Sequence, residues 1–375
     1  MKIILAPDKF KGSLTATEFC EEVAEVLSSY DTSIQIKKLP LADGGDGTIE
    51  VANFYLDGTL VELEVTGPYF DVVHASYLYS EKTKTAFIEM AEASGLKLVK
   101  DQALDTKNTT TLGTGELIKD AISKGANKII LGIGGSATTD CGIGMAKALG
   151  FKFLDNNGLE LKPVGASLSR IERIDKVDVL PELSNVTFTI ACDVSNPLFG
   201  ENGAAYIYAS QKGASTKDIQ LLDDGLRSFS KVLAAEFFID VQDISGAGAA
   251  GGLGAASITF LNGQLNKGIE IIKQLAHFDQ YISDADWIIT GEGKLDQQTF
   301  SGKTIKGVLN SAKKADVKVA AFCGSIDLTK NEIDQLGLSY TNTIMESAQN
   351  INDALQNATT YLRENTKRFI TTILK

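Results

Sequence analysis

The hydrophobic pattern near the start of the chain predicts a strand, a helix and a second strand. Residues 2–6 form a short apolar run and residues 34–39 a second strand-like segment, each closed by a proline. Such segments are typical of a parallel sheet. Between them, apolar side chains recur at helical spacing over residues 19–30, and Thr15 with Glu18 forms a capping box at the helix start. A strand–helix–strand unit of this kind has a right-handed connection.

The period of the pattern then changes. Residues 59–66, 72–79 and 84–90 alternate apolar and polar side chains, which is typical of antiparallel strands with one face in water. Residues 246–254 are too rich in glycine for a helix interior. The remaining middle part predicts helices at 113–124, 139–149 and 216–235 and strands at 128–131, 151–154 and 186–192.

The C-terminal part returns to alternating strands and helices. The pattern predicts strands at 287–290, 317–322 and 341–345, a helix at 304–314, and a final helix with Ile351, Leu355, Ala358 and Leu362 on one face. We therefore predict an α/β fold of two domains. A Rossmann- or flavodoxin-like parallel-sheet domain comprises residues 1–65 and 285–375, and a mixed α/β domain of residues 66–284 is inserted into it, with glycine-rich loops facing the cleft.

Composition limits the possible partners. The 375 residues are 43% hydrophobic and 22% charged, as in a folded protein long enough for two domains. A formal net charge of −12 argues against a nucleic-acid partner, which requires a basic surface. An anionic small molecule remains compatible with this charge, because backbone N–H groups and a few lysines act at short range while distant charges are screened.

The sequence also suggests where the protein resides. It contains no stretch near the ~20 apolar residues of a membrane span and no visible secretory signal. Its four cysteines are scattered, so we expect reduced, buried thiols in a cytoplasmic protein. The two histidines, His74 and His277, lie in no motif and offer little material for a zinc site or a Ser-His-Asp triad.

Five segments rich in Gly, Asp, Lys, Ser or Thr follow predicted strands, at the edge where open α/β sheets bind ligands. They are residues 8–13, 43–48, 132–140, 193–197 and 291–296. Each is also compatible with an ordinary turn. Residues 134–140 could offer backbone N–H groups and hydroxyls to a phosphate, or simply allow a helix to pack closely.

One further segment resembles a known phosphate motif but lacks part of it. Residues 301–304 read Ser-Gly-Lys-Thr, yet the Walker A pattern requires Gly at position 297, where the chain has Gln297. We predict only that Gly302, Lys303 and Thr304 form a helix start that suits an anion. The expected phosphate- and substrate-binding residues are Ser13, Gly134, Gly135, Ser136, Thr138, Thr139, Ser195, Asn196, Gly291, Glu292, Lys294 and Lys303.

These residue types suit phosphoryl transfer, which needs positioned phosphates, Mg²⁺ and a carboxylate near the attacking hydroxyl. Asp193, at the end of a buried strand, is the expected base, and Lys9 and Lys11 are expected to neutralise phosphate oxygens. The aspartates expected to contact Mg²⁺, directly or through water, are Asp8, Asp43, Asp46 and Asp296. Turn formation is the alternative role for each of these four.

Several blocks together resemble the bacterial glycerate kinase family, which includes the glycerate 2-kinases. These blocks comprise residues 6–16, 40–48, 132–140, 191–198, 200, 203–205, 248–254 and 290–296. The resemblance implies transfer of the ATP γ-phosphate to a hydroxyl of D-glycerate, with the 2-position favoured, and two α/β domains with a cleft between them. It settles no individual residue role.

Two other functions fit parts of the sequence. Gly132, Gly134 and Ala137 after a predicted strand resemble the fingerprint of an NAD(P)-dependent oxidoreductase, and Tyr208 with Lys212 could act as its proton-donor pair. Glycines near the start of the following helix weaken that interpretation. The second alternative is a non-catalytic, two-domain protein that binds small acids.

Overall fold

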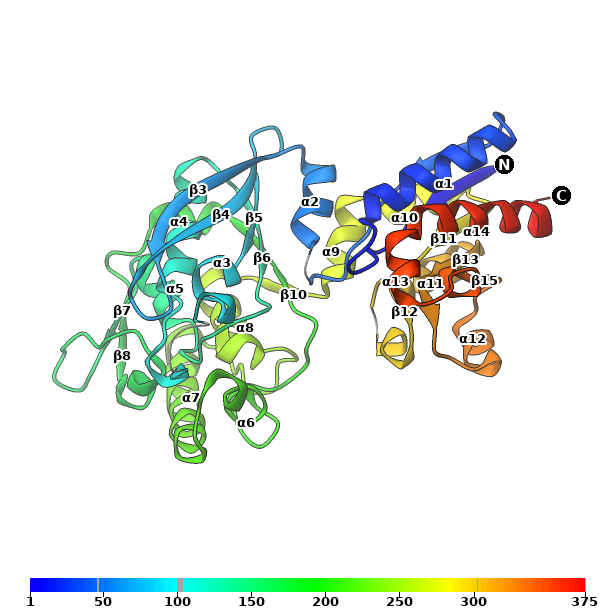
Figure 1. The fold of residues 1–375 in the computed structure, drawn as a ribbon. Coiled ribbons are helices and arrows are strands. Elements are labelled where there is room, and N and C mark those ends of the chain that lie inside the picture. The colour runs from blue at the N-terminus through cyan, green and yellow to red at the C-terminus, as the bar shows by residue number, and fades with distance from the viewer. Residues whose placement is uncertain (46, 100–103, 302, 375) are drawn as a thin grey trace. The chain divides into compact units, whose positions relative to one another are not determined.

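The computed structural model describes residues 1–45, 47–99, 104–301 and 303–374 (Figure 1). The chain forms two compact units. Unit 1 comprises Met1–Tyr55 and Gly268–Lys375, and unit 2 comprises Leu56–Lys267. The overall class is a mixed α/β fold with parallel strands and helices.

Within the described residues, unit 1 contains a five-stranded parallel sheet. Its strands are β1 (Lys2–Leu5), β2 (Gln35–Lys38), β11 (Trp287–Thr290), β13 (Lys318–Cys323) and β15 (Tyr340–Thr343). They lie in the order β15-β13-β11-β1-β2. Counted within the unit, this is the flavodoxin-like order 2-1-3-4-5, in which the strand order reverses between β1 and β11.

Helices cover the sheet of unit 1. They are α1 (Ala16–Tyr30), α2 (Thr48–Leu56), α9 (Gly268–Leu275), α10 (Phe278–Ile282), α11 (Thr304–Ala315), α12 (Lys330–Leu336), α13 (Ile351–Gln356) and α14 (Ala358–Ile373). Helices α1 and α14 lie side by side on one face (Figure 1). Ile3 and Leu5 share a core with Phe19 and Phe369 on this side. The predicted capping box at the start of α1 is confirmed, because the Thr15 hydroxyl accepts a hydrogen bond from the Glu18 N–H and the Glu18 carboxylate accepts one from the Thr15 N–H.

Unit 2 is built on a mixed sheet with the order β10-β9-β6-β5-β4-β3. The strands are β3 (Thr59–Thr66), β4 (Val72–Ser80), β5 (Thr85–Glu89), β6 (Lys128–Gly132), β9 (Thr187–Ala191) and β10 (Gln264–Asn266). Strands β3, β4 and β5 pair antiparallel, as the period of two predicted. Strand β5 then pairs parallel with β6, and the sheet continues parallel to β10.

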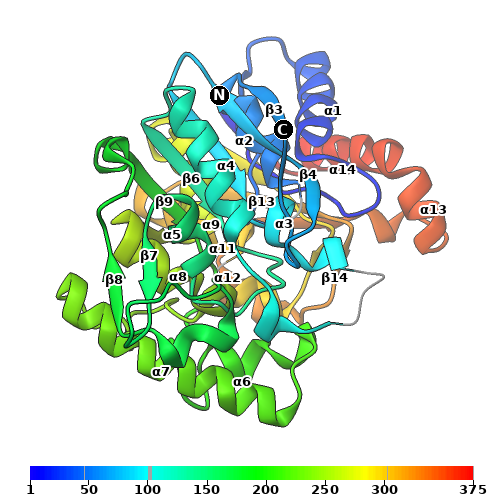
Figure 2. The same ribbon diagram turned by 90° about the vertical axis from the view of Figure 1, so that its left-hand side faces the viewer.

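The helices of unit 2 are α3 (Ala91–Ser94), α4 (Leu112–Ser123), α5 (Ile143–Ala148), α6 (Ala204–Tyr208), α7 (Thr216–Phe237) and α8 (Ala249–Leu261). Helices α4 and α5 pack against each other (Figure 2). Gly115 allows this close approach, because a Cβ atom there would lie 2.3 Å from the Met145 carbonyl oxygen. Two separate two-stranded sheets are also present. They pair β7 (Lys152–Leu154) with β8 (Arg173–Asp175) in unit 2, and β12 (Lys294–Leu295) with β14 (Ser325–Ile326) in unit 1.

The unit boundaries differ from those expected from the sequence. The first lies at residues 55 and 56 rather than 65 and 66, because β3 pairs with β4 and so belongs to the sheet of unit 2. The second lies at 267 and 268 rather than 284 and 285, because α9 and α10 pack against α11 of unit 1. Helices α9 and α10 follow no predicted strand, so the hydrophobic pattern could not indicate that they belong to unit 1.

Three predicted segments are also corrected. Helix 139–149 is reduced to α5, because Cys141 and Gly142 have positive φ angles and cannot continue a helix. Residues 250–252 are non-helical, as their glycine content indicated, but a helix continues from them to Leu261. The predicted final helix is split into α13 and α14 at Asn357, and Ile351 on the expected apolar stripe is 69% exposed.

Two other predictions concern membranes and cysteines. Among the described residues, no helix combines the length and apolar character that crossing a bilayer requires. All four cysteines are buried and unpaired, as expected.

Candidate functional site

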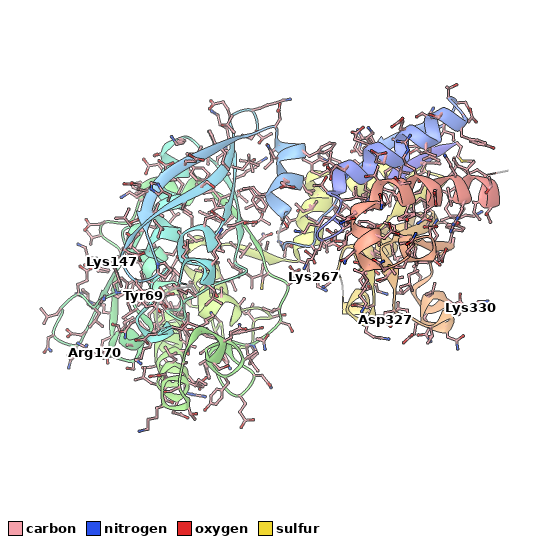
Figure 3. The ribbon with its side chains drawn as sticks, in the orientation of Figure 1. Tyr69, Lys147, Arg170, Lys267, Asp327 and Lys330 are labelled. Carbon is pink, nitrogen blue, oxygen red and sulfur yellow. The ribbon has the colours of Figure 1, made fainter. Side chains whose placement is uncertain are left out.

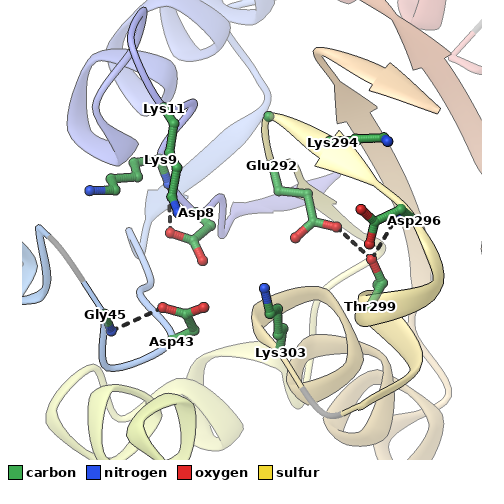
Figure 4. A pocket seen from close by; sticks show the side chains of 11 residues that line it. Asp8, Lys9, Lys11, Asp43, Gly45, Glu292, Lys294, Asp296, Thr299 and Lys303 are labelled. Atoms are coloured by element: carbon green, nitrogen blue, oxygen red, sulfur yellow. Dashed lines mark hydrogen bonds between the residues drawn. The ribbon is translucent and has the colours of Figure 1, made fainter. Parts of the chain in front are cut away.

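A charged cavity lies at the point of unit 1 where the strand order reverses. The loops after β1, β2 and β11 meet there, together with the start of α11 (Figure 4). We call this cavity the carboxylate pocket. Its volume is about 430 Å³, and it is lined by Asp8, Lys9, Lys11, Asp43, Gly45, Glu292, Gly293, Lys294, Asp296, Thr299 and Lys303. Open parallel sheets bind ligands at this position, because the loops diverge there and leave a crevice.

Asp8 is fixed at the inner wall of the carboxylate pocket. Its backbone N–H donates to the Gly291 carbonyl over 2.8 Å, so the loop after β1 is tied to the loop after β11. The Asp8 carboxylate accepts hydrogen bonds from the Lys9 N–H, over 2.7 Å, and from the Thr304 hydroxyl. The pKa of Asp8 is raised to about 6, mainly by burial; the hydrogen bond from Thr304 opposes the rise, and the charge of Asp43 adds to it. Asp8 is therefore a carboxylate held in place but costly to ionise alone.

Glu292 is the second carboxyl group with a shifted pKa. It accepts a hydrogen bond of 2.7 Å from the Thr299 hydroxyl (Figure 4). Burial is the main cause that raises its pKa to about 7, and the charges of Asp8 and Asp296 add to the rise. A group with this pKa exchanges protons near neutral pH, and its ionised form is stabilised by any cation that enters the pocket.

The other predicted metal ligands have simpler surroundings. The Asp43 carboxylate accepts a 3.0 Å hydrogen bond from the Gly45 N–H, which shapes the turn after β2. The Asp296 N–H donates to the Thr299 hydroxyl over 3.3 Å. Asp46, the remaining aspartate predicted for Mg²⁺, lies outside the described residues.

The lysines of the pocket differ in what their ammonium groups contact. Lys303 precedes the first residue of α11, and its ammonium group points toward the space bounded by Asp43 and Glu292 (Figure 4). Lys9 lies against Gly47, where a Cβ atom would come within 3.2 Å of its Nζ. Lys294 instead forms a 3.0 Å ion pair with Asp327, an exposed residue that is labelled in Figure 3. Lys294 thus lines the pocket but directs its charge elsewhere.

The carboxylates fit a Mg²⁺ ion that arrives with a phosphate ligand. Among the described residues, no three His, Cys, Asp or Glu side chains converge closely enough to hold a metal by themselves. Mg²⁺ is usually bound by one or two carboxylates, with water and substrate phosphates completing an octahedron. Asp8 and Asp43 supply such a pair, and the pKa of Asp8 is raised mainly by burial, so a cation bound there would stabilise its ionised form.

The glycine-rich loop of unit 2 is arranged differently. We call residues 134–140 the glycine loop. Gly134 and Gly135 are exposed, but the Ser136, Thr138 and Thr139 side chains are buried. Thr139 shares a 2.8 Å hydrogen bond with Thr106, and the buried Thr138 hydroxyl has no hydrogen-bond partner among the residues that the structure describes. Only the backbone of the two glycines is open to a ligand, so we omit the Thr138 and Thr139 hydroxyls from the proposed site.

A buried lysine holds the glycine loop in place. The Lys212 ammonium group donates to the Ser136 hydroxyl over 2.7 Å and to the Thr138 carbonyl over 2.6 Å. Burial lowers the pKa of Lys212 to about 7, although the charge of Asp140 opposes this change. The sequence suggests Lys212 only as the partner of Tyr208 in a proton-donor pair. Tyr208 donates instead to the Asn196 side chain over 2.6 Å, so the two residues support different loops.

The end of the glycine loop is anchored by Asp140. Its fully buried carboxylate accepts hydrogen bonds of 2.8 Å from both the N–H and the hydroxyl of Thr111, and further bonds from the N–H groups of Gly142 and Gly144. Burial raises the pKa of Asp140, and these four bonds oppose the rise. Helix α5 begins only at Ile143, well beyond Gly132 at the end of β6. A dinucleotide fingerprint requires the helix to begin within the glycine motif, so the geometry does not support the oxidoreductase alternative.

The loop after β9 carries the predicted base. Asp193 and Ser195 are exposed, and Asn196 is half-buried. The Asn196 side chain donates to the Asn202 carbonyl over 2.9 Å and accepts the bond from Tyr208. The loop is thus held at Asn196 and presents Asp193 and Ser195 to solvent.

Most of the predicted site residues lie either in the carboxylate pocket of unit 1 or in two loops of unit 2. Eight line the carboxylate pocket: Asp8, Lys9, Lys11, Asp43, Glu292, Lys294, Asp296 and Lys303. Ser13 borders a neighbouring cavity, and Gly291 is packed where a Cβ would lie 2.2 Å from the Phe322 carbonyl oxygen, so it serves close packing. Apart from Asp46, which like Gly302 lies outside the described residues, the remaining predicted residues belong to the glycine loop and the β9 loop of unit 2. Thr299 was missed, because a hydroxyl six residues past Gly293 carries no distinctive signal. Thr304 was expected only as part of a helix start suited to an anion, and its hydroxyl donates to the Asp8 carboxylate.

The chain is similar to known proteins over its whole length. The sequence profile described as the glycerate kinase family matches residues 3–374. A glycerate kinase of Bacillus subtilis (strain 168) is 42% identical over 375 residues, covering 100% of this chain and 98% of the relative. A glycerate 2-kinase of Escherichia coli (strain K12) is 42% identical, covering 96% and 94%. A crystal structure from Salmonella typhimurium LT2, assigned as glycerate kinase 2, has a TM-score of 0.89 and 40% identity, covering 100% of this chain and 98% of that one.

Proposed function

The chain belongs to the glycerate kinase family, and we propose that it transfers the γ-phosphoryl group of ATP to a hydroxyl of D-glycerate. The products are ADP and phosphoglycerate, and the relative named glycerate 2-kinase favours the 2-phosphate. The observation that carries the proposal is the carboxylate pocket, where lysines and carboxylates with raised pKa values line one cavity at the switch point of a parallel sheet.

The lysines of the pocket are suited to hold the transferring phosphates. Lys9, Lys11 and Lys303 line the cavity, and Lys303 stands at the N-terminus of α11, whose unpaired N–H groups and dipole favour an anion. Positive groups already in place stabilise the charge that spreads over the transferring phosphoryl group, without having to move during the reaction.

The carboxylates of the pocket are suited to Mg²⁺. Asp8 and Asp43 would hold the ion, with Asp296 reaching it directly or through water. When bound, Mg²⁺ neutralises negative charge on the phosphate oxygens. For the chain itself, the cation lowers the cost of keeping Asp8 and Glu292 ionised above neutral pH, because both carboxyl groups have raised pKa values without it.

Asp193 remains the proposed base. In the reaction, the glycerate hydroxyl oxygen forms a bond to the γ-phosphorus, the bond from that phosphorus to the bridging oxygen breaks, and the hydroxyl proton passes to a carboxylate. Asp193 is exposed at the end of a buried strand and lies on a loop anchored through Asn196. We propose that Ser195, Asn196 and the backbone of Gly134 and Gly135 bind the glycerate molecule.

The direct test is product identification by NMR. Purified protein is incubated with ATP, Mg²⁺ and D-glycerate, and ³¹P and ¹H spectra identify the phosphorylated carbon. We expect 2-phosphoglycerate and ADP in equal amounts. An ATP-independent change in NAD(P)H absorbance, with no phosphoglycerate formed, would overturn the proposed function.

A further inference from the structure

An apolar cavity adjoins the carboxylate pocket within unit 1. We call it the apolar pocket. Its volume is about 270 Å³, and its apolar walls are formed by Phe10, Ile344, Met345, Ile351, Ala354 and Leu355. It shares Lys11 and Gly293 with the carboxylate pocket. The two cavities therefore meet at the loops after β1 and β11.

Helix α13 exposes apolar side chains toward this cavity instead of burying them. Ile351 is 69% exposed and Leu355 is 41% exposed, and α13 contributes no buried residue to the core of unit 1. An amphipathic helix normally packs its apolar side against the protein. Contiguous apolar side chains that remain exposed around a cavity indicate a ligand that covers them.

Polar contacts anchor α13 in addition to the packing of Ala354 against the core of unit 1. The Asn350 side chain caps the helix by accepting a hydrogen bond of 3.0 Å from the Asp353 N–H. The Asp353 carboxylate accepts bonds from the Gln349 N–H and from the Tyr361 hydroxyl, over 2.8 and 2.7 Å. The helix is thus held by its polar side while Ile351 and Leu355 remain available.

The two pockets share Gly293, which has no side chain to separate them. A Cβ atom at this residue would lie 3.5 Å from the Lys11 backbone nitrogen and 3.7 Å from the Phe10 Cα. Glycine therefore keeps the space beside the β1 loop open. A ligand that crosses here has one end among apolar side chains and the other among lysines and carboxylates.

We propose that the apolar pocket binds the purine base of the nucleotide, with the phosphates extending past Lys11 and Gly293 into the carboxylate pocket. This inference rests on the proposed function. A nucleoside triphosphate joins a flat, largely apolar base to a polyanion, which matches the two linked cavities. Glycerate is small and polar throughout, so the apolar walls offer it no suitable contact. Met345 adds an adaptable surface against a planar ring.

The first experiment compares ATP with inorganic tripolyphosphate, which lacks a base. Affinities of both, with Mg²⁺, are measured by calorimetry for the wild-type protein, Leu355→Gln and Ala354→Trp. Leu355→Gln keeps size and helix propensity but makes the wall polar, and Ala354→Trp fills the cavity. We expect ATP affinity to fall about 10-fold and at least 30-fold respectively, with tripolyphosphate affinity unchanged.

A matched control and three outcomes make this test decisive. Leu221→Gln changes a leucine of similar exposure, 43%, on helix α7 of unit 2, and should leave both affinities unchanged. Unchanged ATP affinity in both pocket variants overturns the inference while glycerate phosphorylation by the wild type preserves the proposed function. An equal loss of tripolyphosphate affinity also overturns it. A wild-type protein that binds no ATP and forms no phosphoglycerate overturns both.

The second experiment locates the base directly. The wild-type protein is irradiated with 2-azido-ATP, digested with trypsin and examined by mass spectrometry. Residues 331–363 form one tryptic peptide that contains Met345 and all of α13. We expect the label on this peptide, suppressed by excess ATP. An ATP-protected label confined to other peptides overturns the inference.

Discussion

The carboxylate pocket and the glycine loop have similar sequences, but their polar side chains differ in role. Those of the pocket face a cavity, whereas most of those in the loop hold the protein's own backbone in place. Both follow a buried parallel strand and both contain glycine, aspartate and hydroxyl side chains. In the carboxylate pocket, Asp8 and Glu292 face a cavity and have raised pKa values. In the glycine loop, the Asp140 carboxylate and the hydroxyls of Ser136 and Thr139 are buried and hydrogen-bonded within the protein.

The difference teaches what distinguishes a ligand loop from a structural one. A buried aspartate that accepts four hydrogen bonds, as Asp140 does, is satisfied and fixes backbone geometry. Carboxylates that are buried beside a cavity, as Asp8 and Glu292 are, have raised pKa values mainly because burial disfavours their charge, so a cation that enters the cavity can balance that charge. The following variants test this distinction, from the largest expected effect to the smallest.

Asp193→Asn tests whether unit 2 contributes to the chemistry at all. If Asp193 accepts the hydroxyl proton, its amide variant should lower kcat by roughly 10²–10⁴-fold and leave the affinity for Mg·ATP within about twofold of wild type. Steady-state kinetics with D-glycerate and calorimetry with ATP measure the two quantities. Asp224→Asn, at an exposed aspartate on α7, serves as the control. Near-normal kcat in the Asp193 variant would remove it from the role of base.

Lys303→Met and Lys294→Met separate two lysines of the same pocket. The Lys303 ammonium group points into the cavity, whereas that of Lys294 pairs with Asp327 (Figure 4). We expect Lys303→Met to lower kcat/KM for ATP by about 10²-fold, the usual cost of removing one charged donor from a transferring group. Lys294→Met should lower it by less than about threefold. Equal losses in the two variants would show that pointing into the cavity does not matter.

Lys212→Met tests the structural side of the comparison. The variant removes two hydrogen bonds and leaves the Thr138 carbonyl without its donor, so we expect unfolding free energy to fall by about 1–3 kcal/mol. Urea denaturation measures this loss. The folded pKa of Lys212 is lowered to about 7, so between pH 7 and 10 the unfolded chain binds the extra proton and this lysine makes stability rise with pH. The methionine variant should lack that rise. A stable variant with lost activity would instead mark Lys212 as a functional residue.

Local patterns were sufficient for most of the secondary structure. Strand β11 has the predicted bounds, and α1 begins at the predicted capping box, because both depend on neighbouring residues. The segments of the carboxylate pocket were also identified, since strand ends of a parallel sheet share one edge. What failed depends on contacts between distant residues. Lys212 lies 76 positions from Ser136, and nothing near it in sequence indicates that it is buried.

The apolar pocket is a second case in which the local sequence did not indicate burial correctly, because here apolar side chains are exposed. The spacing of Ile351, Leu355, Ala358 and Leu362 predicted one helix with one buried face. Ala358 and Leu362 are buried, as that pattern requires, but Ile351 and Leu355 are exposed. Periodicity predicts which face of a helix is apolar. Whether the protein itself or a ligand covers that face depends on the tertiary fold.

Glu292→Gln has the smallest expected effect and tests the unbalanced charge of the carboxylate pocket without any ligand. The pKa of Glu292 is raised to about 7 in the folded protein, mainly by burial. Between pH 4.5 and 7 the folded protein keeps a proton that the unfolded chain has released, so this group makes stability fall as pH rises. Glutamine does not titrate. The variant should therefore gain stability relative to wild type as pH rises, by on the order of 1–2 kcal/mol at pH 8 because the half-buried group is partly screened.

Urea midpoints at pH 5 and pH 8, measured with EDTA and no nucleotide, check this prediction. Glu201→Gln, at an exposed glutamate of unit 2, should change neither midpoint relative to wild type. Addition of Mg²⁺ and ATP at pH 8 should then stabilise the wild type more than Glu292→Gln, since the bound cation balances a charge that the variant no longer carries. Suppose instead that the urea midpoint of Glu292→Gln differs from that of the wild type by the same amount at pH 5 and pH 8. The charge of the Glu292 carboxylate would then be compensated within the protein, as that of Asp140 is, and Glu292 would not distinguish the carboxylate pocket from the glycine loop.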